Sequence, residues 1–381
     1  MATRALDRAT PLSVGEKLAR VPWPLVALVL LLGLVGYALL YSAAGGSHTP
    51  WAFRHGIRLV VMTGLAVAIA LIDVKKLFRL AYPTYGLVLL LLVAVEIVGE
   101  INKGAQRWID LGFFQLQPSE LMKLALVLAL ARYFHAAYLE EVRRPLFLLP
   151  PVLMIFLPVV LVLKQPDLGT AAMLGTVGTA MLFLGGMAIW KFIAAGALAA
   201  AALPIAWAKL HEYQRQRILT FLDPESDPLG AGYHIIQSKI AIGSGGLWGR
   251  GYLRGTQAQL SFLPEKHTDF AFTMLAEETG FVGAVAVLAL ILAITLAGTA
   301  IALRAESQFA RLLAAGVTCN FALYAIVNVA MVTGSIPVVG VPLPLVSYGG
   351  TAMLTVMIGI GLLLNVQVHR DTPIPRFPAD P

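Results

Sequence analysis

Long apolar runs constrain this chain more than any other feature. Ten stretches approach or exceed the about 20 residues that a helix needs to cross the ~30 Å hydrocarbon core of a membrane. They cover residues 23–41, 51–72, 80–99, 118–134, 146–163, 168–189, 192–208, 270–303, 309–333 and 349–368. This pattern predicts an all-α polytopic membrane protein with ten transmembrane helices. The eighth run is too long for one straight span, so we expect it to tilt or to project from the membrane.

The composition supports a membrane protein. The 381 residues are 58% hydrophobic and 13% charged, whereas soluble domains carry about 25% charged residues. The formal net charge is +7, and the basic residues fall mainly between the apolar runs, which indicates contact with membrane lipids and not with nucleic acid. The one cysteine, Cys319, excludes an internal disulfide and argues against a cysteine metal site.

The distribution of Lys and Arg predicts the orientation. If the N-terminus is cytoplasmic, the inner segments hold fourteen basic residues and the short outer segments five. Basic residues favour the cytoplasmic side, so we expect both termini to be cytoplasmic. The chain then forms a single transmembrane domain, residues 1–381, with cytoplasmic tails at 1–22 and 369–381. The connection between the seventh and eighth helices, residues 211–268, becomes a large extracytoplasmic loop.

Four ionisable residues stand directly before the eighth run. Glu265, Lys266, His267 and Asp269 lie within five positions at the expected outer edge of the membrane. A connecting loop has no need of so many ionisable groups at this depth, so a functional role is one interpretation. The alternative is structural: Asp269 caps a helix, and Lys266 marks the lipid interface.

Other charged residues map to the same outer level. Glu120 and Lys123 are spaced to share one helix face, and Asp167 starts the sixth run. Read structurally, the first two are a self-neutralising pair and Asp167 is an N-cap; Arg54 and Arg107 could contact lipid headgroups. Because ionisable groups are costly in a membrane, their common depth predicts a polar cavity that opens to the outside.

The connection between the ninth and tenth runs is apolar but cannot be a regular helix. Residues 334–350 contain three prolines and several glycines. Irregular backbone at membrane depth is tolerated where protein covers it or where it lines a cavity. We therefore expect a re-entrant or packed loop near the same cavity.

Several motifs resemble the SEDS family of bacterial membrane proteins (shape, elongation, division and sporulation), and particularly its elongation branch. The resemblance covers nearly the whole chain. Its strongest motifs are Lys103-Gly-Ala-Gln-Arg-Trp-Ile-Asp-Leu-Gly112, Gln117-Pro-Ser-Glu-Leu-Met-Lys123, Gln165-Pro-Asp-Leu-Gly-Thr170, Phe262-Leu-Pro-Glu-Lys-His-Thr-Asp-Phe270 and Pro342-Leu-Pro-Leu-Val-Ser-Tyr-Gly-Gly350. Ala271 and Ala352 depart from the usual pattern at uncharged positions.

The resemblance implies a peptidoglycan glycosyltransferase. Such an enzyme polymerises lipid II into β-1,4-linked glycan strands at the outer face of the bacterial cytoplasmic membrane during cell elongation. It also implies that Asp269 is the essential carboxylate and that Glu120, Lys123 and Asp167 surround the cavity; Arg54 matches less securely. A class B penicillin-binding protein, the transpeptidase that crosslinks the strands, is the implied partner.

The implied reaction inverts the anomeric carbon, because an α-linked diphosphate donor gives a β-linked product. A general base must then accept the proton of the acceptor hydroxyl, and Asp269 is the candidate. Cations would stabilise the departing diphosphate; Arg107, Lys266 and His267 are further candidates to bind substrate, as are Arg215 and Arg217. A divalent cation such as Mg or Mn could assist, whereas no nucleotide or redox cofactor is expected.

Two other functions fit parts of the sequence. A flippase for the lipid-linked precursor would also need a charged cavity, but its polar groups should continue toward the inner leaflet. A non-catalytic scaffold would tolerate the conservative change Asp269→Asn.

Overall fold

The computed structural model describes residues 12–102, 105–110, 112, 115–209, 215, 219–223, 231–256 and 265–376. Much of the predicted loop 211–268, Arg217 included, lies outside the described residues. The same holds for residues 1–11 and 377–381 of the predicted tails.

The described chain is mostly helical, and each predicted apolar run falls on a helix. Those helices are α2 (Trp23–Ala43), α3 (Ala52–Leu71), α4 (Val74–Val98), α5 (Pro118–His135), α7 (Pro145–Lys164), α8 (Leu168–Leu184), α9 (Ile189–Lys209), α13 (Ala271–Arg304), α14 (Gln308–Val332) and α15 (Gly350–Val368). Short helices α1 (Val14–Ala19), α6 (Leu139–Val142) and α11 (Ala231–Ser244) lie outside those runs.

Seven of the helices in the described residues are long and apolar enough to cross a membrane: α2, α3, α4, α7, α13, α14 and α15. The apolar parts of α8 and α9 are shorter. α5 carries Glu120, Lys123 and Arg132 within its 18 residues, which lowers its overall hydropathy. The prediction of a helical, multi-pass membrane protein is confirmed by these spans.

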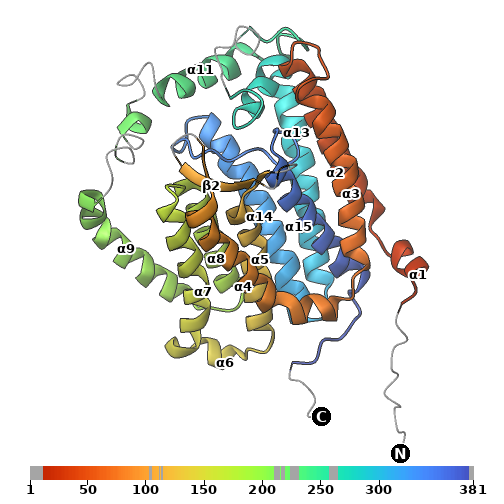
Figure 1. Cartoon of the computed structure of the whole chain (residues 1–381), viewed down its shortest axis with the longest axis vertical. Coiled ribbons are helices and arrows are strands. Elements are labelled where there is room, and N and C mark those ends of the chain that lie inside the picture. Colours follow the sequence, from red (N-terminus) through yellow and green to blue (C-terminus); the bar gives the residue numbers. More distant parts are fainter. Residues whose placement is uncertain are drawn as a thin grey trace, which may run out of the picture.

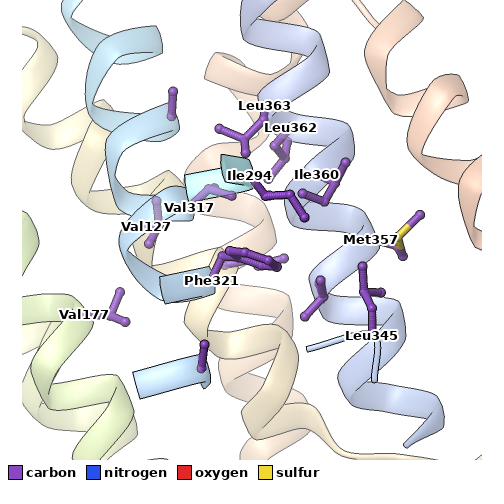
Figure 2. Close-up of a cluster of buried hydrophobic side chains, with 14 of the residues drawn as sticks. Val127, Val177, Ile294, Val317, Phe321, Leu345, Met357, Ile360, Leu362 and Leu363 are labelled. Atoms are coloured by element: carbon purple, nitrogen blue, oxygen red, sulfur yellow. The ribbon is translucent and has the colours of Figure 1, made fainter. Parts of the chain in front are cut away.

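The long helices form one bundle, with β2 and α11 at one end and α6 at the other (Figure 1). Of the candidate spans, α15 and α14 are the most buried, at 78% and 61%. Figure 2 shows the interior where they meet: Phe321 and Val317 of α14 lie near Ile360 of α15 and Ile294 of α13. This apolar core fixes the helix ends that carry the polar residues.

The prediction of an all-α fold is wrong for the connection between α4 and α5. There the chain forms strands β1 (Glu100–Asn102), β2 (Ala105–Asp110) and β3 (Gln115–Leu116), paired antiparallel in that order. Trp108 and Ile109 favour a strand, and Gly112, with φ of +84°, permits the reversal that follows β2. The periodicity of the apolar runs does not detect a sheet this small.

The eighth run is neither straight nor simply tilted, because α13 is broken at Gly280 (φ 67°, ψ −166°). Segment 245–251 satisfies the backbone groups that the break exposes: Phe281 N–H donates to Gly246 O (2.9 Å), and Arg250 N–H donates to Glu277 O (3.0 Å). Irregular backbone at this depth is thus hydrogen-bonded within the protein. Residues 271–279 form a separate half-helix.

Helix α9 stands away from the rest of the bundle in Figure 1. From residue 193 to residue 208, every side chain that the structure describes is exposed. Ile193, Leu198 and Trp207 are among them, so the surface of α9 suits hydrocarbon and not water.

Gly280 is required for the break in α13. A Cβ at this position would lie 2.3 Å from Gly249 N and 2.6 Å from Leu247 O, and the positive φ alone costs a side chain ~1–3 kcal/mol. We expect Gly280→Ala to lower the midpoint of thermal unfolding in detergent by on the order of 5 °C or more. Gly64→Ala is the control, because a Cβ on that helical glycine meets no atom within 4 Å. Equal midpoints for the two variants would contradict this role of Gly280.

Candidate active site

A polar cavity of about 450 Å³ opens where α5, α8 and α13 begin. Four of the predicted site residues line it: Arg107, Glu120, Asp167 and Asp269. The loop after α14 closes one side through residues 338–342 and 348–349, as the prediction of a packed loop near the cavity required. The sequence therefore placed the cavity correctly at the start of these helices.

Asp269 is half-buried and lies just before α13. The N-cap residue of α13 is Phe270, which makes no side-chain cap, so the interpretation of Asp269 as the cap of this helix is wrong. Asn328, fully buried on α14, donates from Nδ2 both to Asp269 O (2.8 Å) and to Val341 O (2.7 Å). One amide therefore fixes the backbone of Asp269 against the loop.

Gly340 gives the Asp269 carboxylate space. Its φ is +72°, and a Cβ built on it would lie 3.5 Å from Asp269 Oδ2. Gly340 itself lines the cavity. Backbone without a side chain thus flanks the carboxylate, and a substrate can approach closely there.

Glu120 lies at the cavity wall, and two buried side chains that do not line the cavity bond to its carboxylate. Its Oε1 accepts from Lys123 Nζ (2.6 Å), and its Oε2 accepts from the hydroxyl of Tyr324. Lys123 is 0% exposed, and its Nζ lies 4.1 Å from the centre of the Tyr324 ring. Lys123 therefore does not line the cavity; it neutralises and orients the carboxylate that does.

Asp167 and Arg107 form another part of the polar wall. Asp167 is the N-cap of α8, with Oδ1 accepting from Thr170 N (3.1 Å), and Gln117 Nε2 donates to its Oδ2 (3.3 Å). Arg107 Nη1 lies 3.8 Å from Asp167 Oδ2, and Arg107 Nε donates to Gln165 O (3.0 Å). Both interpretations of Asp167 hold, because it caps a helix and also lines the cavity.

Besides Lys123, four predicted substrate-binding residues lie outside the cavity lining: Arg54, Arg215, Lys266 and His267. Arg54 is exposed on α3, while Lys266 and His267 are half-buried. The His267 ring stacks on Trp51 with centroids 4.4 Å apart. Burial lowers the pKa of Lys266, and the charge of Glu278 partly offsets this. Their binding roles remain predictions.

Sequence reasoning named Glu265 in the cluster before the eighth run but gave it no role of its own, and it missed Arg58 and Asn328. Glu265 lines the cavity, and its Oε2 accepts from Thr268 Oγ1 (2.9 Å). Arg58 lies 5.1 Å from the ring of the cavity residue Tyr348 and is one helical turn from Arg54. The only available signal for Asn328 was an amide in an apolar run.

The cavity combines carboxylates that can accept a proton with a guanidinium that can bind a phosphate oxygen. Within the described residues, no group of three or more His, Cys, Asp or Glu side chains is arranged to hold a metal ion. A magnesium ion needs only one or two carboxylates when substrate phosphates supply further oxygens. Asp269 and Glu265 are two carboxylates that line the cavity.

The Lys123–Glu120 pair yields a stability prediction. We expect Lys123→Met to cost about 3–5 kcal/mol, because it leaves a buried carboxylate without its cation. The double variant Glu120→Gln/Lys123→Met should cost less than Lys123→Met alone. Chemical unfolding in detergent measures both. Asp371→Asn, which removes exposed pairs with Arg20 and Arg370, is the control and should cost less than about 1 kcal/mol. Additive costs in the double variant would contradict this pairing.

Comparison with known proteins identifies the family. The family model described as "Cell cycle protein", which covers FtsW, RodA and SpoVE, matches residues 19–372. Peptidoglycan glycosyltransferase MrdB of Escherichia coli K12 is 46% identical over 349 residues, 91% of this chain and 94% of that protein. A probable peptidoglycan glycosyltransferase FtsW of Idiomarina loihiensis is 35% identical over 356 residues, 91% and 87% of the two chains.

Solved structures agree in fold. A chain from a peptidoglycan synthase complex, studied for its coordination of polymerization and crosslinking, superposes with a TM-score of 0.80 at 34% identity and covers 93% of this chain and 99% of that one. The rod-shape-determining protein RodA of Thermus thermophilus gives a TM-score of 0.67 at 31% identity, covering 93% and 98%. This chain therefore belongs to the SEDS family of peptidoglycan glycosyltransferases, as a multi-pass protein of the inner membrane.

Proposed function

We propose that the chain polymerises lipid II into β-1,4-linked glycan strands at the outer face of the cytoplasmic membrane during cell elongation, with Asp269 as general base. One observation carries the proposal: the half-buried carboxylate of Asp269 shares a cavity with Arg107, Glu120 and Asp167 at one end of a membrane bundle. The similarity to MrdB and RodA supports the elongation role.

The proposed step is a single displacement. The 4-hydroxyl oxygen of the acceptor sugar attacks the anomeric carbon of the donor, while Asp269 accepts the hydroxyl proton. The bond from that carbon to the diphosphate oxygen breaks, and the lipid diphosphate leaves with its electron pair. The configuration changes from α to β.

The protein groups stabilise the charge that moves in this step. Arg107 lines the cavity and can bind a phosphate oxygen of the leaving group. Glu120 is neutralised by Lys123, so the wall that it forms repels the diphosphate less than a free carboxylate would. We propose that a divalent cation, Mg or Mn, assists the reaction: Asp269 or Glu265 would hold it, and it would supply Lewis-acid stabilisation of the charge on the diphosphate.

The proposed topology has ten spans and two cytoplasmic termini. The three helices outside the seven strongest candidates still suit a membrane interior: α8 and α9 are apolar, and the Glu120–Lys123 pair neutralises charge in α5. With this orientation the cavity faces outward. Segment 231–256 and the outer sheet then lie on the side where a class B penicillin-binding protein would crosslink the product; the relative in the synthase complex supports such a partner.

The base assignment gives a direct test. We expect Asp269→Ala and Asp269→Asn to lower polymerisation of purified lipid II by at least about 100-fold, the low end of what a general base contributes. Glu96→Gln is the matched control. Glu96 is an exposed acid near the C-terminal end of α4 and does not line the cavity. Near-normal polymerisation by Asp269→Asn would contradict the assignment of Asp269 as the general base.

The same purified protein separates the enzyme from a flippase. If the wild-type protein moved labelled lipid II across the membrane of vesicles but formed no polymer, the proposal of an enzyme would be contradicted. The described charged residues of the cavity lie at one end of the bundle, which favours polymerisation over transport.

The cation gives a further prediction. We expect chelation with EDTA to lower the polymerisation rate about ten-fold or more, and added Mg or Mn to restore it, because the leaving diphosphate would lose a stabilising charge. Glycan product is the readout, and thermal midpoints with and without EDTA control for unfolding. An unchanged rate in EDTA would exclude the cation and would leave the Asp269 proposal standing.

A further inference from the structure

A second and larger cavity, of about 760 Å³, lies at the opposite end of the bundle from the active site. Helix α5 connects the two: Glu120 lines the polar cavity, and Arg132, about 18 Å further along the helix, lines this one. The walls come from the first turns of α4, the last turns of α5, the start of α7 and residues 374–376. The proposed topology puts this pocket at the cytoplasmic surface of the membrane.

Positive charge dominates the lining. Lys75, Arg79, Arg132 and Arg376 contribute four cations, against the single acid Glu141. The salt bridges among the described residues involve other cations. Within the described residues, these four cations therefore form no salt bridge with a carboxylate. Uncompensated positive charge at a membrane surface attracts anions.

The guanidinium of Arg132 is held in a fixed orientation. It lies 4.4 Å from the centre of the Tyr82 ring and 4.9 Å from that of Phe78, and its Nη1 donates to Arg79 O (2.8 Å). A planar guanidinium that is ordered before a ligand arrives loses little freedom on binding, and its geometry suits the oxygens of a phosphate.

The rest of the lining is aromatic and aliphatic. Phe78, Tyr82, Tyr133 and Phe147 form much of the wall. Beside the pocket, Leu80 of α4 is 54% exposed and Leu146 of α7 is 78% exposed, as expected for side chains that face hydrocarbon. A free phosphate ion needs no apolar wall, whereas a lipid phosphate remains attached to acyl chains that do.

We infer that this pocket binds the headgroup phosphate of an anionic phospholipid of the inner leaflet. The four cations contact the headgroup, and the acyl chains lie along the exposed faces of α4 and α7. The site is separate from the one that handles the glycan substrate, and it does not depend on the proposed reaction. It anchors the C-terminal residues 374–376 and the ends of α4 and α5 to the same lipid.

A charge-matched pair of variants tests the inference. The pocket variant is Lys75→Gln/Arg79→Gln/Arg376→Gln. The control, Lys76→Gln/Arg143→Gln/Arg144→Gln, removes three exposed cations from the same end of the molecule but outside the pocket. Arg132 is retained because it packs on two rings. Equal thermal midpoints for the two variants confirm that both are folded.

Phosphatidylglycerol is titrated into the detergent-purified full chain, and bound lipid is counted by native mass spectrometry. Each juxtamembrane cation contributes about five-fold to binding an anionic surface, so the pocket variant should bind the first lipid about 100-fold more weakly than wild type. The control should change that affinity by less than about five-fold.

Five results would overturn the inference. The two variants could lose affinity equally, or neither could lose any. Phosphatidylcholine could bind wild type as tightly as phosphatidylglycerol. Inorganic phosphate at equal concentration could displace the lipid, which would make this a simple anion site. A glutamate-rich peptide could displace it instead, which would assign the pocket to an acidic protein partner.

Discussion

The hydrocarbon of a membrane offers no hydrogen bonds, so every charge and every irregular peptide at that depth must find its partner within the protein. The pair of Lys123 and Glu120 shows the consequence most directly. A lysine with no exposed surface is retained because a carboxylate lies 2.6 Å away and an aromatic ring lies beside its ammonium group. The cation in turn keeps Glu120 fixed at the wall of the cavity.

The same constraint governs the backbone around Asp269. The loop after α14 is irregular, yet Asn328 bonds to its Val341 carbonyl and to the Asp269 carbonyl. The break in α13 is filled by segment 245–251. The non-helical backbone beside Asp269 and at the break in α13 is therefore hydrogen-bonded within the protein.

Much of this arrangement could be predicted from the sequence, because apolar runs and buried charges are strong local signals. The helices and the shared depth of Glu120, Asp167 and Asp269 followed from them. The small sheet did not, because its strands are too short for the apolar pattern to detect. The break at Gly280 and the contact of Arg58 with Tyr348 did not either, since each depends on segments distant in the chain. Spacing alone could not show that Lys123 lies behind Glu120 or that Lys266 lies outside the cavity.

The junction at Gly280 has a consequence for how related sequences can diverge. Gly245, Gly249 and Gly280 meet across one contact, where a methyl group on any of them would come within 2.3 Å of the facing backbone. To avoid the clash, the two segments would have to separate, and the hydrogen bonds that join them would break. Substitutions at these three positions are therefore coupled. Related sequences keep all three glycines, or they change the conformation of α13 and of the segment that packs on it together.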